Sequence, residues 1–460
     1  MTRKLFGTDG VRGVANREPM TSEVALALGR AIAAISKSHH RRVIHPRVIH
    51  PRHRILIGKD TRLSGYMLET ALASGICSMG TDVLLVGPLP TPAVAFLTRS
   101  MRADAGVVIS ASHNLYQDNG IKFFDAKGFK LPDEEELEIE KIVFNTDAKS
   151  PRPTADHIGK AFRVDDASGR YISYLKGLFP EGMTLEGIKV VLDCAHGAAY
   201  GVAPTILEEL GAEVVRIGVT PNGTNINEGV GALYPEKMQE TVKKEKAAIG
   251  IALDGDADRA VFCDERGDRV PGDAVLAILA KDLLDKGRLA QKGFVATVMS
   301  NLALEHLAQS WGCQLFKAAV GDRYVVEELR KRKLNFGGEQ SGHIVFLDHA
   351  TTGDGMLAAI RLLEIVVSSG RPVSELARIL KPYPQVLINV KVREKKPFEE
   401  IAAVRDQAAR VEKELSGKGR LLLRYSGTEN LARVMIEGEN EQKIQKLAED
   451  LAGCLQKNLG

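Results

Sequence analysis

The sequence predicts an α/β protein of several domains, and three observations lead to this prediction. At 460 residues the chain is longer than one hydrophobic core usually organises, so about three or more domains are expected. Segments with helical spacing alternate with short runs of Val, Ile and Leu, as expected for strands covered by helices on both faces. One pattern also recurs, in which a helix stops at a glycine and an apolar strand follows directly.

The recurring pattern occupies residues 78–87, 209–218 and 310–321. Each segment has a glycine where the end of a helix commonly adopts the left-handed conformation, and these glycines are Gly80, Gly211 and Gly312. The repetition predicts three units of related topology.

Each unit continues with a second strand that ends in a polar loop. These segments read AGVVISASHN from Ala105, AIGIALDGDADR from Ala248 and LNFGGEQSGH from Leu334. Open α/β sheets bind ligands beyond the carboxyl ends of their strands, so loops at equivalent strand ends are candidate ligand sites. For any one unit taken alone, an ordinary helix-to-strand linker is the alternative interpretation.

Changes in composition and the positions of proline suggest where domains end. PDEEELEIE at 132–140 predicts a solvated acidic helix, SPRPT at 150–154 a break, and KPYP at 381–384 a linker into a last, smaller α+β domain. We expect four domains, at residues 1–165, 166–268, 269–383 and 384–460.

The overall composition is that of a soluble globular protein. The net charge is only +3, so the global field favours neither nucleic acid nor an anionic membrane as a partner. Five cysteines without a CxxC pair argue against a disulfide framework and a thiolate zinc site. The N-terminus lacks the apolar segment of a secretory signal, and no apolar run is long enough to span a bilayer, so a cytoplasmic protein is expected.

The most specific motif is LDGDADR at 253–259. Asp254, Asp256 and Asp258 follow an apolar strand at a spacing of two, and they would repel one another severely unless a cation lay between them. Oxygen ligands favour Mg²⁺ over Zn²⁺. A calcium EF-hand is excluded because Arg259 stands where its turn glycine belongs. A solvated acidic turn is the alternative.

Ser112 ends the equivalent strand of the first unit, so its hydroxyl could face the same ion. No G-x-S-x-G elbow or Ser-His-Asp order surrounds it, which favours phosphoryl transfer over acyl transfer. His113 and Lys122 are candidates for proton transfer. The alternatives are a backbone hydrogen-bond partner for the histidine and an outward strand residue for the lysine.

Two further loops could bind a substrate. LLLRYSGTEN offers a set that can hold a phosphate dianion through charge-assisted hydrogen bonds, although an ordinary turn is an equal alternative: Arg424, Ser426, Gly427 and Thr428. GGEQSGH offers groups that suit sugar hydroxyls or an ammonium: Glu339, Ser341 and His343.

From KLFGTDGVRG at Lys4 to RVMIEGE at Arg433, with all four loops in order, the chain resembles the α-D-phosphohexomutase superfamily, and GEQSGH and FGTDGVRG resemble its glucosamine branch. The resemblance implies three related α/β domains with mixed sheets and a smaller C-terminal α+β domain, arranged around a central cleft. It implies an isomerase that interconverts glucosamine 6-phosphate and glucosamine 1-phosphate through a phosphoserine and a sugar bisphosphate. Such a reaction would feed UDP-N-acetylglucosamine synthesis for the cell wall.

The resemblance also implies roles for single residues. Ser112 would carry the phosphoryl group and, with the three aspartates, bind one Mg²⁺. Arg12 and Arg259 would neutralise the transferring group, and Lys122 would be the leading general acid or base, beside His113. The sugar would contact the GGEQSGH residues, and its phosphate the RYSGT residues. Glucosamine or glucose 1,6-bisphosphate would be an activator, and a homodimer is compatible with the resemblance.

Three alternative functions stay open. A phosphomannomutase or phosphoglucomutase of the same superfamily would share every loop. A haloacid-dehalogenase-like phosphatase would use Asp254 as its nucleophile, although its usual DxDGT signature is absent. A sugar-phosphate binding protein without catalysis is the third.

Residues 39–54 contain VIHPR twice in tandem and hold five of the eleven histidines. Proline in each copy prevents a continuous helix, so the histidines gain no fixed ligand geometry. We expect a solvated basic insertion, with metal or RNA binding as the alternative.

Overall fold

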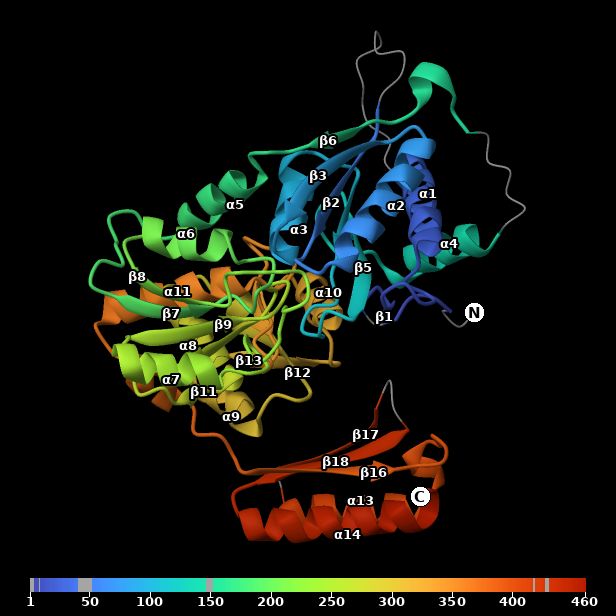
Figure 1. Cartoon of the computed structure of the whole chain (residues 1–460). Helices are drawn as coiled ribbons and strands as arrows, with labels where there is room; N and C mark the ends of the chain where they lie inside the picture. Colours follow the sequence, from blue (N-terminus) through green and yellow to red (C-terminus); the bar gives the residue numbers. More distant parts are fainter. Residues whose placement is uncertain (1–3, 8, 40–51, 146–151, 417, 427–429) are drawn as a thin grey trace. The chain divides into compact units, whose positions relative to one another are not determined.

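The computed structural model describes residues 4–7, 9–39, 52–145, 152–416, 418–426 and 430–460. The chain divides into two compact units, which are described separately (Figure 1). Unit 1 comprises Met1–Met299 and Leu315–Ile379, and unit 2 comprises Ser300–Gln314 and Leu380–Gly460.

The first sheet of unit 1 has six strands in the order β1-β5-β4-β2-β3-β6. Its middle strands β4, β2 and β3 are parallel, and β5 is antiparallel to β4. The strands are β1 (Val11–Val14), β2 (Arg54–Lys59), β3 (Asp82–Pro88), β4 (Ala105–Ile109), β5 (Asp118–Asp125) and β6 (Ala161–Arg163). The helices are α1 (Ser22–His39), α2 (Ser64–Ser78), α3 (Thr91–Ser100) and α4 (Asp133–Phe144).

The second sheet has five strands in the order β11-β10-β9-β7-β8. Its strands are β7 (Lys189–Asp193), β8 (Glu213–Ile217), β9 (Ile249–Leu253), β10 (Ala260–Cys263) and β11 (Arg269–Val270). Its helices are α5 (Ala167–Lys176), α6 (Val202–Glu209) and α7 (Glu236–Glu245). Strand β9 pairs with the antiparallel strand β10, as β4 pairs with β5 in the first sheet.

The third sheet has four strands in the order β13-β12-β14-β15. Its strands are β12 (Gly293–Thr297), β13 (Gln314–Ala318), β14 (Phe336–Gly338) and β15 (Ile344–Phe346). The neighbouring helices are α8 (Gly272–Asp285), α10 (Asp322–Arg332), α11 (Gly355–Ser369) and α12 (Val373–Leu376). Three-residue 3₁₀ turns lie at Ala155–His157, Ala290–Lys292, Ala377–Ile379 and Phe398–Glu400.

The three sheets share one strand order. Read from the antiparallel strand inward, it runs β5-β4-β2-β3, then β10-β9-β7-β8, then β15-β14-β12-β13. The prediction of three units with related topology is therefore confirmed. Each antiparallel strand follows its central neighbour directly, so the loops after β4, β9 and β14 occupy equivalent positions at the carboxyl ends of those strands.

The three glycines that recur in the repeated pattern lie just beyond the ends of their helices, as predicted. Gly80, Gly211 and Gly312 have φ angles of 74°, 100° and 67°, and each stands two residues beyond the last residue of its helix. In this left-handed region a side chain would be strained, which is why glycine is the residue there.

Unit 2 contains a three-stranded sheet in the order β16-β18-β17, with α13 and α14 on one face of it (Figure 1). Its elements are α9 (Leu302–Ser310), β16 (Gln385–Lys391), α13 (Ala402–Leu415), β17 (Gly419–Tyr425), β18 (Leu431–Gly438) and α14 (Glu441–Leu459). Asn440 begins α14 by accepting a hydrogen bond from the Lys443 amide at 2.9 Å. Three α/β sheets with mixed strands and a smaller α+β unit confirm the predicted fold class.

The acidic helix α4 differs from its prediction. Glu136 and Glu140 are buried rather than solvated, at 6% exposure each. Glu140 accepts hydrogen bonds from the backbone amides of Leu5 and Phe6 at 2.6 and 2.9 Å, and Glu136 pairs with Arg323. The prediction of a solvated helix was wrong for these two residues, because composition alone does not show which carboxylates meet donors from distant segments.

Among the described residues, none of the helices has both the length and the apolar character needed to cross a membrane. The five cysteines are free thiols. The basic insertion lies largely outside the described residues, at 40–51, between α1 and β2.

Candidate active site

Two equivalent loops of unit 1 meet through their side chains. Strands β4 and β9 are buried along their whole length, and each delivers its loop to the carboxyl edge of its sheet. Ser112 Oγ donates a hydrogen bond to Asp254 Oδ2 at 2.6 Å, across 142 positions of sequence. Both side chains are shielded from solvent, at 1% and 0% exposure.

The backbone of the serine loop is held from behind. Ser112 has a φ of 50°, an unusual conformation for a residue with a side chain. Arg62 donates to the carbonyls of Ser112 and Asn114 at 3.1 and 2.5 Å, and Asn227 donates to the same two carbonyls at 2.9 Å. The Ser112 amide donates to Ser110 Oγ at 2.9 Å. These bonds keep the loop in its strained conformation and direct the hydroxyl toward the second loop.

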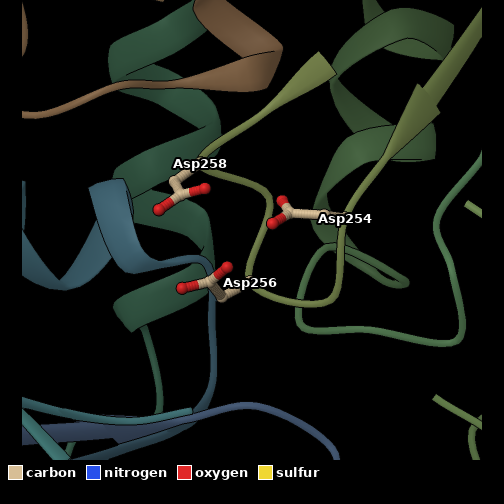
Figure 2. Close-up of side chains that lie close together, drawn as sticks. All are labelled: Asp254, Asp256 and Asp258. Carbon is tan, nitrogen blue, oxygen red and sulfur yellow. The ribbon is translucent and has the colours of Figure 1, made fainter. Parts of the chain in front are cut away.

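The loop after β9 carries three convergent carboxylates (Figure 2). One oxygen each of Asp254, Asp256 and Asp258 lies within 4.8 Å of the others, and all three residues are buried. Among the described residues, Asp256 Oδ1 and Asp258 Oδ1 have no hydrogen-bond donor although they are inaccessible to water. Burial and the charges of its two neighbours raise the pKa of Asp254 well above its usual range. This arrangement fits a cation with oxygen ligands, and the cluster can hold a metal.

Asp256 is anchored by a neighbouring helix and a lysine. Thr91, the first residue of α3, donates from Oγ1 to Asp256 Oδ2 at 2.6 Å, and Lys122 Nζ donates to the same oxygen at 3.0 Å. Lys122 is 2% exposed and also lies 3.0 Å from Asp9 Oδ2. Burial alone would lower the pKa of Lys122, but Asp256, Asp9 and Asp258 outweigh it and raise that pKa. Lys122 is therefore an ammonium directed into the carboxylate cluster.

Of three more predicted residues, His113 contacts the serine hydroxyl, and Arg12 and Arg259 act on His113 through their charges. His113 Nδ1 lies 3.3 Å from Ser112 Oγ. Burial, followed by the charges of Arg259 and Arg12, lowers the pKa of His113 to about 4, so the imidazole is neutral at physiological pH. Arg12 pairs with Asp9 at 2.5 Å, and Arg259 Nε lies 3.8 Å from Asp258 Oδ1. The two guanidiniums carry positive charge, which suits the binding of an anionic phosphoryl group.

The third equivalent loop follows β14 and carries the predicted sugar-binding residues. Glu339 Oε1 accepts a hydrogen bond from the Gly321 amide at 2.9 Å, and Ser341 Oγ lies 3.5 Å from Glu339 Oε2. His343 lies deeper, at 1% exposure, with Nδ1 3.7 Å from Asp258 Oδ1, an ion-pair distance rather than a hydrogen bond. Its Nε2 accepts from the Gly353 amide at 2.9 Å. His343 is thus a buried neighbour of the carboxylate cluster, on the side of Asp258.

In unit 2 the predicted phosphate loop follows β17. Arg424 lies opposite Arg433 on β18, and burial together with this neighbouring charge lowers the pKa of Arg424. Lys395 Nζ donates to the Ser426 carbonyl at 2.7 Å, and Arg433 Nη2 lies 3.5 Å from Ser426 Oγ. Like charges paired across strands are unfavourable alone, so this cluster suits an anion. Gly427 and Thr428 lie outside the described residues.

Sequence reasoning missed several residues of these sites. Asp9, Thr91 and Arg62 contact or support the predicted residues in unit 1, and Arg433 and Lys395 extend the cationic cluster in unit 2. Asp9 stands in the FGTDG motif, but nothing in that motif predicts a role for its carboxylate. The other four carried no local signal, because only tertiary structure brings them to these loops.

Comparison with known families identifies all four parts of the chain. Models of the phosphoglucomutase/phosphomannomutase family match at residues 3–150 (α/β/α domain I), 170–267 (domain II), 271–383 (domain III) and 387–453 (the C-terminal domain). The chain belongs to this family. The three strand-end loops therefore come from three different α/β domains of a phosphohexomutase.

Relatives in bacteria match over the full length of the chain. The chain is 58% identical to a protein of Syntrophotalea carbinolica named phosphoglucosamine mutase, covering 100% of this chain and 99% of the relative. It is 56% identical to a phosphoglucosamine mutase of Anaeromyxobacter dehalogenans, with 100% of both chains covered. The predictions that the chain is an enzyme and belongs to the hexosamine branch of the superfamily are thereby confirmed.

Solved structures share the fold at low sequence identity. A phosphoglucomutase/phosphomannomutase family protein of Burkholderia thailandensis matches with a TM-score of 0.82 at 23% identity, over 99% of this chain and 98% of the other. An Aspergillus fumigatus N-acetylphosphoglucosamine mutase, solved with GlcNAc-6P and magnesium, matches with a TM-score of 0.64 at 15% identity, over 99% and 96% of the chains.

Proposed function

We propose that the chain interconverts glucosamine 6-phosphate and glucosamine 1-phosphate through a phosphorylated Ser112 and a sugar bisphosphate. The observation that carries the proposal is the 2.6 Å hydrogen bond between Ser112 Oγ and Asp254 within a buried carboxylate cluster. A hydroxyl in that position suits phosphoryl transfer, in which the protein positions groups and neutralises charge. The names of the full-length relatives support glucosamine as the sugar.

In this proposal one Mg²⁺ is held by Ser112 Oγ and by the three carboxylates, Asp254, Asp256 and Asp258. Bound there, the ion supplies positive charge that polarises a phosphoryl oxygen. The unsatisfied oxygens of Asp256 and Asp258 support this ligand set. Arg12 and Arg259 neutralise the charge of the phosphoryl group that is transferred.

The proton transfers are assigned to groups near the hydroxyls that react. His113 Nδ1, neutral and 3.3 Å from Ser112 Oγ, accepts or returns the serine proton. Lys122 Nζ exchanges a proton with the sugar hydroxyl that attacks or leaves. Lys122 is the leading candidate because its ammonium, held by three carboxylates, can donate a proton to the sugar oxygen that leaves when its phosphoryl group is transferred to Ser112.

Substrate binding is assigned to the two remaining loops. Glu339 and Ser341 hold sugar hydroxyls or the amino group, with His343 supporting that loop from behind. The cationic loop of unit 2 holds the phosphate that is not being transferred, through Arg424, Ser426, Gly427 and Thr428. This loop binds phosphate rather than one face of the sugar. The bisphosphate can therefore reorient in the site and present its second phosphoryl group.

The wider setting follows from the same proposal. The chain acts in the cytoplasm on a phosphosugar, without a nucleic-acid or membrane partner, and supplies precursors for UDP-N-acetylglucosamine and peptidoglycan. Glucosamine or glucose 1,6-bisphosphate primes Ser112. The proposed domain borders lie at 165/166, 268/269 and 383/384, and a homodimer is compatible with the proposal.

Ser112→Ala tests the mechanism. Loss of the hydroxyl should reduce turnover by at least about 10⁴-fold, as for other essential nucleophiles. Ser100→Ala, at an exposed hydroxyl on the end of α3, should leave turnover unchanged. After incubation with labelled glucose 1,6-bisphosphate, peptide mapping should find acid-stable phosphate on Ser112. Acid-labile phosphate on Asp254 would instead establish the phosphatase chemistry, and full activity of Ser112→Ala would refute the proposal.

A second candidate function is phosphoglucomutase or phosphomannomutase activity, because the matching family models carry that description. A side-by-side assay of glucosamine, glucose and mannose phosphates separates the two. The proposal expects the highest kcat/KM for glucosamine phosphate.

A further inference from the structure

Six ionisable side chains of unit 1 form a closed ring in which two lysines and a histidine alternate with carboxylates. They come from the three α/β domains: Asp9, Lys122, Asp258, His343, Asp322 and Lys130. The proposed function uses Lys122 and Asp258, and assigns His343 a supporting part. It leaves the opposite arm of the ring, Lys130 with its two carboxylates, without a role.

The half of the ring that contains Lys122, Asp258 and His343 includes its longer ion-pair contacts. Lys122 Nζ lies 3.0 Å from Asp9 Oδ2 and 3.8 Å from Asp258 Oδ2. His343 lies between two carboxylates, with Nδ1 3.7 Å from Asp258 and Nε2 3.6 Å from Asp322. These contacts connect the general acid or base, the carboxylate cluster and the sugar-binding loop.

The other arm of the ring is formed by the largely buried ammonium of Lys130. Lys130 Nζ donates to Asp9 Oδ1 at 2.5 Å and also to Asp322 Oδ2. Burial would lower the pKa of Lys130, but Asp322 and Asp9 raise it, so the ammonium form is retained. The backbone of Lys130 forms a bridge to Phe124 on β5, which limits how far the side chain can move.

The two oxygens of Asp9 have different partners. Oδ1 contacts Lys130, whereas Oδ2 contacts both Lys122 and Arg12. The ammonium of Lys130 thus fixes the rotation of a carboxylate that positions a proton-transfer group and a phosphoryl-binding group. Without it, Asp9 and Asp322 would be two neighbouring carboxylates in a largely buried place, and they would repel each other.

Docking between the first and third α/β domains does not depend on Lys130. Arg323, the next residue after Asp322, pairs with Asp133 and Glu136 on α4 and donates to the Leu131 carbonyl. These contacts join α10 to α4 independently. Loss of the Lys130 charge should therefore disturb the alignment of the ring while the two domains stay packed.

We propose that Lys130 and Asp322 are positioning residues for phosphoryl transfer, which act through Asp9 to hold Lys122 and Arg12 in register with the loop of domain III. This inference rests on the proposed function. It assigns no contact with substrate to Lys130 or Asp322.

The test compares Lys130→Met with the matched control Lys127→Met, an exposed lysine on the same turn after β5. Turnover is measured per mole of phosphorylatable Ser112, so that a smaller folded fraction does not count as a slower reaction. A misplacement of about 1 Å can cost about 100-fold in rate, so kcat of Lys130→Met should fall about 10- to 100-fold. KM for glucosamine phosphate should change by less than about threefold, because the sugar and phosphate loops are intact.

Two further variants separate positioning from a general structural effect. Lys130→Arg restores the charge and should recover most of the lost kcat. Asp322→Asn in the Lys130→Met background removes the repulsion with Asp9, so the double variant should be no slower than Lys130→Met alone. A purely structural role would instead lower the phosphorylatable fraction and leave kcat per active site unchanged.

The outcomes separate this inference from the proposed function. If Lys130→Met keeps wild-type kcat while Ser112→Ala is inactive, the positioning role is overturned and the proposed function stands. If Ser112→Ala has the turnover rate of the wild type, both the proposed function and this inference are refuted. A selective fall in kcat that arginine rescues supports the inference.

Discussion

The loops after β4 and β9 occupy the same position in two related sheets and yet are stabilised in opposite ways. Both follow five-residue buried strands, and both contain a non-glycine residue with positive φ, Ser112 at 50° and Ala257 at 55°. In the serine loop the backbone carbonyls receive donors from Arg62 and Asn227. In the aspartate loop two carboxylate oxygens have no donor among the described residues.

This difference shows what the shared topology decides and what it leaves to side chains. The strand order delivers both loops to one place. The serine loop is complete within the protein, because its polar groups have partners. The aspartate loop is incomplete, since three buried carboxylates lie within 4.8 Å of one another and need a positive partner. The two loops should therefore respond differently to substitution and to metal.

Among the effects that test this comparison, the largest concerns the charge of the aspartate loop. Asp254→Asn removes the negative charge of a proposed metal ligand that also accepts the Ser112 hydrogen bond, so turnover should fall by at least about 10³-fold. In the presence of a chelator, however, the variant should unfold at the same temperature as the wild type or higher, because one of three repelling carboxylates is gone.

Calorimetry with and without Mg²⁺ checks this prediction. Added Mg²⁺ should raise the melting temperature of the wild type and of Asp268→Asn, an exposed carboxylate on the next turn, but not that of Asp254→Asn. A wild type whose melting temperature ignores Mg²⁺ would contradict the view that this loop is incomplete without a cation.

A smaller effect concerns pH and the helix behind the aspartate loop. Asp354 begins α11, accepts a hydrogen bond from Tyr171 at 2.8 Å, and precedes Gly355, whose amide donates to the Ala257 carbonyl at 3.0 Å. Burial raises the pKa of Asp354 from 3.8 to about 6. Because the folded state binds this proton more tightly, the contribution to stability is full below about pH 4 and is lost as pH rises through about 6.

Asp354→Asn isolates this contribution, since asparagine also begins helices well. Relative to the variant, the wild type should lose about 2 kcal/mol of unfolding free energy between pH 4 and pH 7. Denaturant unfolding at a series of pH values measures the difference. A difference that does not vary with pH would show that the carboxyl is not titrating as expected.

The smallest effect concerns the contact between the two loops. A methyl group on Gly255 would lie 2.5 Å from the Ser112 carbonyl oxygen, so Gly255→Ala should push the serine and aspartate loops apart. We expect kcat to fall about tenfold, because phosphoryl transfer needs close alignment. Gly169→Ala is the control, since no described atom lies within 4 Å of its added methyl group. Unchanged kcat in Gly255→Ala would show that the loops tolerate separation.

Much of the fold and of the candidate site could be predicted from local sequence. Gly80, Gly211 and Gly312 marked the repeat because the left-handed end of a helix favours glycine in any context. Asp254, Asp256 and Asp258 were found because like charges at a spacing of two are costly without a cation. The buried state of Glu140 was missed, because its backbone donors, the amides of Leu5 and Phe6, lie more than 130 positions away in the chain.

The sequence by itself determined the family, the repeated α/β units and the residue types that carry the chemistry, because these depend on short-range pattern and composition. Only the tertiary structure decided which oxygen of Asp254 meets Ser112, that His343 lies behind the carboxylates, and that Lys130 closes a ring with Asp9 and Asp322. The physical reason is that an ion pair depends on distance in space. Strand order and helix packing set that distance for residues that no local motif connects.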